Sequence, residues 1–341
     1  MKALVKTAAL KAIDTFGLNA WARGRHRDSL VVLNYHGVLD GDFRHADRNI
    51  YCNTVGTEEF SLHLEFLSRC YQPVRAVDVE AWLHGERDLP ARSVLLTFDD
   101  GLRNNLTHAA PILRRYGVPA IIFLSTAYMG SARLLWPQEL YELAMRWPEP
   151  AIPGPEAPSI PLGSERSASA RELVALAKTL PVSTVESWMQ ALRAKSPLPP
   201  ELPSDPVYAF LSWDEAAELT RFGFEIGSHT VNHWILTRCT PELLRTELED
   251  SRREIERWLG TSCTSFCYPN GTAADWSSES AAAVKQAGYR AAYALSDRIQ
   301  RRTGVNAFAI DRLMVPGSVS QAAYRTRVSG MIEALRSLLR G

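Results

Sequence analysis

A chain of 341 residues is long enough for one large α/β barrel or for two ordinary domains. Its 46% hydrophobic and 22% charged residues are typical of a globular protein with a sizeable buried core. The formal net charge of zero excludes a global electrostatic attraction to nucleic acid, so no nucleic-acid partner is expected. No stretch reaches the ~18 unbroken apolar residues that a membrane span needs.

Residues 1–29 are predicted to form an N-terminal amphipathic segment. Two interpretations stay open: a helix packed against the rest of the protein, or a helix lying on a membrane surface through its apolar face and its basic charge. Lys11 and Asp14 interrupt the apolar run that a signal peptide requires. The apolar positions at helical spacing are Val5, Ala9, Ile13 and Phe16.

The five cysteines are odd in number, scattered, and form no Cys-x-x-Cys pair. Such a set is typical of reduced thiols and not of a disulfide framework or a zinc knuckle. We therefore expect a cytoplasmic protein, with peripheral contact at the inner face of the membrane as the alternative. The cysteines are Cys52, Cys70, Cys239, Cys263 and Cys267.

Short apolar runs alternate with helical patterns from residue 30 onward, which is typical of parallel α/β folds. Strands are predicted at 30–35, 93–98, 120–124, 223–226, 265–268 and 289–295, with a last apolar stretch near 308–310. Helices are predicted at 57–71, 79–83, before Gly117, at 213–220, 240–259 and before Gly288. We expect an α/β fold, a distorted (β/α)7-type barrel over residues 30–318, followed by a C-terminal helix over 319–341.

The regular alternation breaks between residues 148 and 206, where twelve of the twenty prolines lie. Proline sustains neither helical nor ladder hydrogen bonds, so such clusters mark irregular or inserted segments. One helical stretch is predicted within it, at about 169–192. We interpret 148–206 as an insertion on the barrel rim, because it has too little apolar sequence for a core of its own.

Two adjacent carboxylates, Asp99 and Asp100, end the predicted strand 93–98 in the string TFDDG. Active sites of α/β barrels lie at the carboxyl ends of the strands. Adjacent side chains on an extended backbone point different ways, so one carboxylate can bind a cation while the other stays free as a base. Taken alone, the string fits an ordinary Asp-Gly turn equally well.

His229 and His233 follow the predicted strand 223–226 in the string SHTVNH. A spacing of four on one helical turn would put both imidazoles on the same side. Two histidines and one carboxylate are a common set of ligands for catalytic zinc. A single His-x-x-x-His is weak evidence by itself and gains weight from its combination with TFDDG.

Two further polar strings also end predicted strands. FCYPNG, residues 266–271, contains a Pro-Asn-Gly turn whose backbone N–H groups are suited to stabilising an oxyanion, with a plain turn as the alternative. NYHGV, residues 34–38, places His36 at the same mouth, as a general acid or as a buried core histidine. Four polar strings at four strand ends predict one common site.

These strings resemble those of the polysaccharide deacetylase family, the NodB-homology domain of carbohydrate esterase family 4, over most of the chain. TFDDG and His-Thr-x-x-His match the family's first two motifs. The resemblance implies that Asp99 is the catalytic base. It also implies that Asp100, His229 and His233 bind a divalent metal, with Zn²⁺ expected first and Co²⁺ or Ni²⁺ as alternatives.

The chain departs from the family pattern at two places. FCYPNG resembles the third motif, usually Arg-x-Pro-Tyr, but Cys267 stands where arginine is common and Asn270 where tyrosine is. This leaves the partner of Asp99 open, with Arg312 as a candidate. The late Leu-x-Leu-His motif is absent. The string YHGV resembles the N-terminal arrangement of the branch that includes poly-N-acetylglucosamine deacetylases, which implies that His36 is the catalytic acid.

Several aromatic and polar residues are predicted to contact the substrate. Tyr268, Asn270 and Trp234 are assigned to the substrate or to its oxyanion. Trp136 and Trp213 are further candidates for stacking on sugar rings, with simple core packing as the alternative for every aromatic residue.

The expected function is metal-dependent hydrolysis of the N-acetyl group of an amino sugar, releasing acetate. The expected partner is an N-acetylated glycan, as a polysaccharide, an oligosaccharide or a lipid-linked sugar in exopolysaccharide biosynthesis. Two alternatives stay open: an O-acetyl esterase or non-sugar amidase using the same metal site, and a non-catalytic glycan-binding protein. The missing arginine and the displaced histidine favour the last. The sequence makes no prediction of the oligomeric state.

Overall fold

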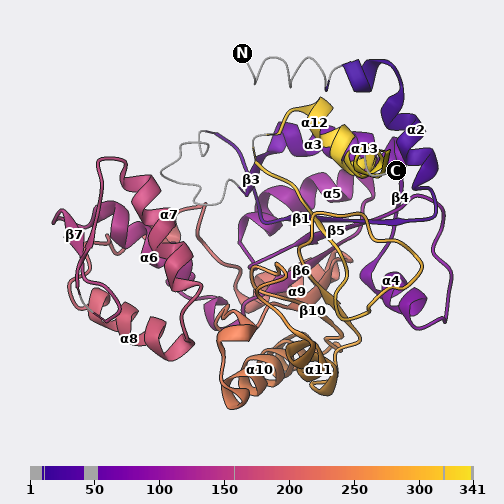
Figure 1. Cartoon of the computed structure of the whole chain (residues 1–341). Coiled ribbons are helices and arrows are strands. Elements are labelled where there is room, and N and C mark those ends of the chain that lie inside the picture. Colours follow the sequence, from indigo (N-terminus) through magenta and orange to yellow (C-terminus); the bar gives the residue numbers. More distant parts are fainter. Residues whose placement is uncertain (1–9, 11, 42–52, 157, 318, 339–341) are drawn as a thin grey trace.

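A parallel sheet forms the centre of the computed structural model, which describes residue 10 and residues 12–41, 53–156, 158–317 and 319–338 (Figure 1). The strand order is β11-β10-β9-β6-β5-β1-β12, with β4 paired to β5 outside this path, and all of these pairings are parallel. The strands are β1 (Leu30–Tyr35), β4 (Gln72–Pro73), β5 (Ser93–Phe98), β6 (Ala120–Leu124), β9 (Glu225–Ser228), β10 (Ser265–Cys267), β11 (Ala291–Tyr293) and β12 (Leu313–Met314).

The segment from residue 310 to residue 315 joins the two end strands of this sheet. Ile310 exchanges backbone hydrogen bonds with Ala292 and Ala294 beside β11, each 2.9 Å long. Three residues later, β12 pairs with β1 at the opposite end of the sheet. The sheet is therefore curled into a distorted barrel, which confirms the predicted fold class. Arg312 lies between the two pairings.

The helices cover the outside of the barrel and begin and end at recognisable sequence signals. For α10, Thr240 Oγ1 accepts a hydrogen bond from the N–H of Leu243, and the helix stops at Gly260, whose φ is 65°. The helices are α2 (Leu18–Arg25), α3 (Thr57–Cys70), α4 (Ala76–Leu83), α5 (Ala110–Tyr116), α9 (Trp213–Arg221), α10 (Pro241–Leu259), α11 (Ser278–Gln286), α12 (Gln321–Val328) and α13 (Met331–Leu338).

The structure tests the prediction for the C-terminal end of the chain, but it describes only part of the N-terminal segment. The single predicted C-terminal helix is wrong: α12 and α13 are separate helices because Gly330, with φ of 75°, interrupts them. At the N-terminus, residues 1–9 lie outside the described part of the chain, and Phe16 is 79% exposed. The packing of that segment, the cytoplasmic location and the membrane contact stay predictions. Over the described ranges, no helix is both long and apolar enough to cross a bilayer.

The predicted insertion, 148–206, contains the helices α7 and α8 and a short antiparallel ribbon. Together with α6, which directly precedes it, it forms a lobe at one side of the barrel in Figure 1, and from here on we call this lobe the insertion. The single helical stretch predicted at 169–192 is wrong, because Pro181 separates α7 from α8. The domain boundaries themselves stay a prediction. The elements are α6 (Trp136–Arg146), β7 (Ala151–Ile152), β8 (Ile160–Pro161), α7 (Arg166–Ala177) and α8 (Val182–Arg193).

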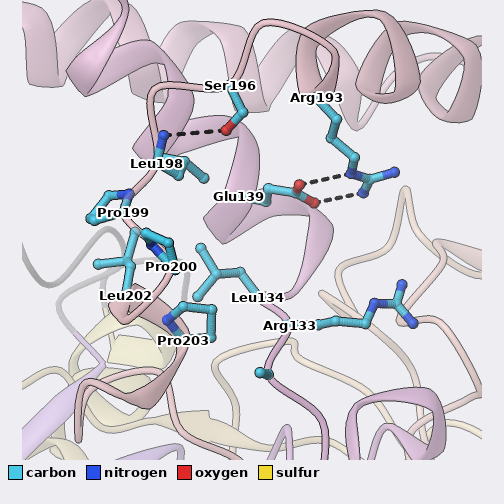
Figure 2. Close-up of a pocket in the computed structure, with 11 residues that line it drawn as sticks. Arg133, Leu134, Glu139, Arg193, Ser196, Leu198, Pro199, Pro200, Leu202 and Pro203 are labelled. Carbon is cyan, nitrogen blue, oxygen red and sulfur yellow. Dashed lines mark hydrogen bonds and ion pairs between the residues drawn. The ribbon is translucent and has the colours of Figure 1, made fainter.

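The insertion has its own apolar cluster, contrary to the expectation that its sequence is too polar for one. Helix α6, which precedes the predicted boundary at 148, supplies a large part of that cluster, including Trp136, Leu140 and Leu143. Arg193 of α8 donates two hydrogen bonds of 2.7 and 2.6 Å to Glu139 of α6 (Figure 2). This ion pair fixes the two helices beside a cavity of about 500 Å³.

Candidate functional site

A cavity of about 260 Å³ brings together residues from all four predicted strings. Its lining residues follow the carboxyl ends of β1, β5, β9 and β10 or lie in the segment between β11 and the end of β12. These strand ends are where the chemistry of a barrel enzyme is expected. Among its lining residues are His36, Asp99, Asp100, His229, His233, Asn270 and Arg312.

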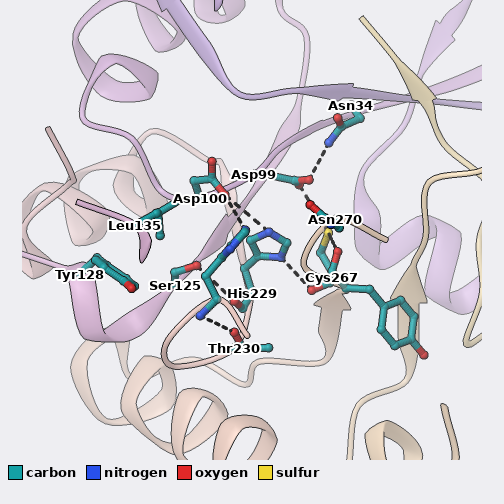
Figure 3. Close-up of polar contacts among 12 residues, drawn as sticks. Asn34, Asp99, Asp100, Ser125, Tyr128, Leu135, His229, Thr230, Cys267 and Asn270 are labelled. Atoms are coloured by element: carbon teal, nitrogen blue, oxygen red, sulfur yellow. Dashed lines mark hydrogen bonds and ion pairs between the residues drawn. The ribbon is translucent and has the colours of Figure 1, made fainter. Parts of the chain in front are cut away.

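Asp100, His229 and His233 present three potential metal-ligand atoms to one point. Oδ1 of Asp100 lies 3.6 Å from Nε2 of His229 (Figure 3). It lies 3.3 Å from Nε2 of His233. Zinc bonds of about 2.1 Å at tetrahedral angles put ligand atoms about 3.4 Å apart. Oδ1 of Asp100 is buried and has no hydrogen-bond donor among the described residues. The three side chains therefore fit a small divalent ion.

The two histidines converge without forming a helical turn, so that part of the prediction is wrong. Residues 229–233 are a loop in which Thr230 and His233 adopt left-handed conformations, with φ of 68° and 60°. Thr230 Oγ1 accepts a 2.9 Å hydrogen bond from the N–H of His233 and fixes this loop. Left-handed non-glycine residues are strained, and such strain is common at functional sites.

Glu247 of α10 supports this loop and is a site residue that the sequence did not reveal. Its buried carboxylate accepts hydrogen bonds from the N–H of Val231 at 2.9 Å and from the N–H of Asn232 at 2.8 Å. It also accepts one from Nδ2 of Asn232 at 2.8 Å. In the sequence Glu247 is one of many charged residues on α10, so nothing but the tertiary structure distinguishes it.

The environment of His229 orients it for metal binding. Its Nδ1 lies 2.8 Å from the carbonyl oxygen of Cys267, which can only accept, so Nδ1 carries the proton. Nε2 then offers its lone pair toward Asp100. Burial lowers the pKa of His229 to about 4, so the imidazole is neutral near pH 7.

Asp99 also lies near His229, but its carboxylate is held in a buried ion pair with Arg312. Arg312 donates from Nη1 to Oδ1 at 2.7 Å and from Nη2 to Oδ2 at 2.9 Å, and Asn34 donates to Oδ2 at 2.7 Å. Burial alone would raise the pKa of Asp99, but the Arg312 guanidinium, with His229 adding to it, holds that pKa below its usual range. The two adjacent carboxylates thus have separate surroundings.

A second group of potential ligands, formed by Asp99, His229 and Cys267, also converges but fits a metal poorly. Burial raises the pKa of the Cys267 thiol well above its usual value, whereas zinc binds the thiolate. The guanidinium of Arg312 already occupies both oxygens of Asp99. The group around Asp100 is therefore the better metal site.

His36 and Asn270 line the same cavity. His36 is half-buried directly after β1, and its carbonyl oxygen accepts a 2.6 Å hydrogen bond from Asn105 Nδ2. Asn270 lies in the turn after β10 with φ of 61°, a conformation that asparagine tolerates better than most residues. Its Oδ1 accepts a 2.8 Å hydrogen bond from Lys178 Nζ.

Tyr268 and Trp234, which were predicted to contact sugar, both lie in the packed interior. Tyr268 is fully buried, and its hydroxyl donates a 2.9 Å hydrogen bond to the carbonyl of Phe308. Trp234 is 7% exposed and stacks on Trp136 with ring centroids 5.3 Å apart. Trp213 likewise stacks on Trp258. Each of these rings already packs against protein, which favours the core-packing alternative.

Comparisons with known proteins agree with this geometry. The model of the polysaccharide deacetylase family matches residues 86–292, more than half of the chain. YxkH of Bacillus subtilis, whose name describes a polysaccharide deacetylase, is 19% identical over 314 residues that cover 92% of this chain and 81% of YxkH.

Two further relatives match over shorter stretches. The poly-beta-1,6-N-acetyl-D-glucosamine N-deacetylase of Escherichia coli K12 is 30% identical over 95 residues, or 28% of this chain and 13% of that protein. The enzyme of the same name from Staphylococcus aureus MSSA476 is 26% identical over 112 residues, or 30% of this chain and 38% of that protein. The similarity to these enzymes is thus confined to part of each chain.

Solved structures share the fold. IcaB from Ammonifex degensii superposes with a TM-score of 0.56 at 18% identity, over 89% of this chain and 96% of that one. The deacetylase PplD of Streptococcus pyogenes gives a TM-score of 0.56 at 17% identity, over 86% and 94%. On the family match, the chain belongs to the polysaccharide deacetylase family and is a hydrolase of the carbohydrate N-deacetylase class.

Proposed function

We propose that this chain removes the N-acetyl group from an amino sugar in a polysaccharide, an oligosaccharide or a lipid-linked glycan, and that it needs a divalent metal to do so. The observation that carries the proposal is the meeting, in one cavity, of the Asp100–His229–His233 group and the Asp99–Arg312 ion pair. The names of the E. coli and S. aureus relatives support N-acetylglucosamine as the sugar.

Asp100, His229 and His233 would hold the metal. Two imidazoles and one carboxylate suit Zn²⁺ best, with Co²⁺ or Ni²⁺ as alternatives. When bound, such an ion activates water at neutral pH and polarises an acyl carbonyl. The hydrogen bond from His229 to the Cys267 carbonyl keeps one ligand in the right tautomer before any ion arrives.

The remaining residues would move protons and stabilise charge. Asp99, kept anionic by Arg312, accepts the proton of the attacking water. The main-chain N–H of Asn270 stabilises the negative charge that develops on the acetyl oxygen. His36 donates a proton to the departing sugar nitrogen, which is needed because an amide anion is a poor leaving group. The products are acetate and a free amino sugar.

The alternative of a non-catalytic glycan-binding protein loses one of its two supports. It rested in part on the missing arginine of the third motif, yet Arg312 supplies a guanidinium to Asp99 from another part of the chain. A protein that only bound glycan would have no need for a buried carboxylate paired in this way beside Asp100 and its two histidines.

The test is acetate release measured by mass spectrometry on a panel of substrates. The panel contains N-acetylglucosamine oligomers, lipid-linked N-acetyl sugars and O-acetylated sugars, each with protein loaded with Zn²⁺, Co²⁺ or Ni²⁺. We expect release from N-acetyl substrates that Asp99→Asn abolishes. Release from O-acetyl sugars alone would support the esterase alternative, and no metal-dependent release from any substrate would overturn the proposal.

A further inference from the structure

The insertion forms one wall of the active-site cavity. Leu135, Pro137 and Gln138 from the start of α6 line it, as does Lys178, which lies directly after α7. The insertion also contacts the metal-ligand loop, because Trp136 Nε1 donates a 3.1 Å hydrogen bond to the carbonyl of His233. The side chains that line this wall therefore differ from those of a barrel without the insertion.

Lys178 is the one cation that the insertion adds to this lining. Its Nζ donates a 2.8 Å hydrogen bond to Oδ1 of Asn270, across the cavity wall from the insertion to the turn after β10. Burial lowers the pKa of Lys178 to about 8, an effect that Asp275 and Asp100 partly offset. Partial burial of an ammonium group is unfavourable unless the group has a specific partner.

Contacts of the Lys178 backbone restrict the position of its ammonium group. Lys178 caps the C-terminus of α7, where the helix dipole favours a positive charge. Its carbonyl accepts a 3.3 Å hydrogen bond from Nε of Arg238, which follows the metal-ligand loop in the chain. Both ends of the residue are thus tied to the barrel, and the bond to Asn270 is directed by the fold.

The Asn270 turn must be held in one conformation if the main-chain N–H of Asn270 is to stabilise an oxyanion. Its left-handed φ of 61° is followed by a left-handed Gly271, with φ of 73°. A left-handed non-glycine conformation is less favourable than an ordinary one even for asparagine, so the turn depends on its contacts to keep this shape. The turn is held on its far side by the hydrogen bond from Leu295 N–H to the Gly271 carbonyl, 2.7 Å long. On the cavity side, the hydrogen bond from Lys178 holds the Asn270 side chain.

We propose that Lys178 is a positioning residue: by holding the Asn270 side chain, it keeps the main-chain N–H of Asn270 directed at the developing acetyl oxyanion. The insertion is then a required wall of the active site and not an appendage on its rim. This inference rests on the proposed function, since it presupposes that Asn270 stabilises the oxyanion.

The test compares Lys178→Met with Lys178→Arg and with Lys195→Met. Arginine keeps an N–H donor, whereas methionine keeps only the apolar stem. Lys195 is an exposed lysine of the same insertion and serves as the matched control. Losing an oxyanion donor outright lowers kcat about 10²–10³-fold, so its misplacement in Lys178→Met should lower kcat by about 10–100-fold with KM nearly unchanged. Lys178→Arg should recover most of kcat, and Lys195→Met should match the wild type.

A second readout does not depend on catalysis. Hydrogen–deuterium exchange of a peptide covering residues 266–273, measured in metal-free protein, should be faster in Lys178→Met and unchanged in Lys195→Met. Wild-type kcat in Lys178→Met would overturn the inference. So would a lower kcat with unchanged exchange, which would mean that the charge acts on the substrate and not through Asn270. Asp99→Asn tests the proposed function separately: if it stays active, that function fails whatever Lys178 does.

Discussion

Arg312 and Asp99, 213 residues apart in the chain, form a bidentate ion pair inside the barrel, with N–O distances of 2.7 and 2.9 Å. The guanidinium is held from behind by the carbonyl of Ala294 and by Thr97 Oγ1, each at 3.0 Å. It comes from the segment that closes the barrel, whereas the family's usual arginine would come from the position of Cys267. Arg312 is thus the partner of Asp99 that the sequence had left open.

Breaking this pair should cost both stability and activity. Arg312→Met leaves the Asp99 carboxylate buried without its counter-ion, which typically destabilises a protein by about 3–5 kcal/mol. Urea denaturation measures the free energy of unfolding, and acetate release measures activity. Arg298→Met, at an exposed arginine nearby, should change stability by less than about 0.5 kcal/mol. Equal stability of the two variants would show that the ion pair contributes little.

The two groups of potential metal ligands can be distinguished by which variant loses zinc. Asp100→Asn should lose stoichiometric zinc, because it removes the only carboxylate of the Asp100–His229–His233 group. Cys267→Ala should keep zinc and most of the activity, since the thiol makes only weak hydrogen bonds, to Asp99 at 3.5 Å and to the Tyr268 carbonyl at 3.7 Å. Elemental analysis of purified protein gives the metal content. Zinc loss in Cys267→Ala alone would instead assign the ion to the group that contains Asp99.

Glu247 should govern metal affinity without touching the metal. Glu247→Ala removes the acceptor that holds Val231 and Asn232, so the loop carrying both histidines should loosen. Losing a partner of this kind typically weakens metal binding by about 10–100-fold. Competition with a chelator measures the affinity. Glu242→Ala, at an exposed position of the same helix, should bind zinc as the wild type does, and an unchanged affinity in Glu247→Ala would contradict the prediction.

His36 should matter only where the leaving group needs a proton. His36→Gln should lower kcat on an N-acetyl sugar by about 10²–10⁴-fold, the usual contribution of a general acid. An aryl acetate leaves without protonation, so its hydrolysis should change little. The main-chain contact from Asn105 to residue 36 is independent of the side chain and should survive. An equal loss on both substrates would indicate a structural role for His36.

Local signals account for the parts of the fold that the sequence predicted well. The strands at 30–35, 93–98 and 120–124 were predicted with the bounds of β1, β5 and β6, because each is a short apolar run that ends in polar or turn residues. The polar strings at their carboxyl ends placed Asp99 and Asp100 at the mouth of the barrel. Such signals depend on residues close together in the chain.

The remaining features depend on distant contacts. His229 and His233 lie on a strained loop because Glu247 of α10 holds it, which no spacing rule for the string itself can predict. Trp234 was predicted to contact sugar, but Trp136 of the insertion covers its ring. Lys178 follows a helix like any surface lysine, and only the docking of the insertion brings it to Asn270.

His63, which does not line the active-site cavity, should make the protein sensitive to mild acid. It is fully buried, and its ring stacks on Tyr324 with centroids 3.6 Å apart. Burial lowers its pKa from the ordinary 6.5 to about 3. Between these values the unfolded chain binds a proton that the folded protein does not, so the free energy of unfolding falls as the pH falls.

The expected loss from this group alone between pH 7 and pH 5 is about 2 kcal/mol, from a slope of about 1.4 kcal/mol per pH unit below 6.5. His63→Phe keeps an aromatic ring against Tyr324 but cannot be protonated, so its stability should fall by about 2 kcal/mol less over this range. Urea titrations at both pH values, with excess zinc throughout, measure the difference. His84→Gln, at an exposed histidine, should behave as the wild type. Parallel pH profiles for His63→Phe and the wild type would mean that His63 is protonated in the folded protein, and that its burial does not exclude the charge.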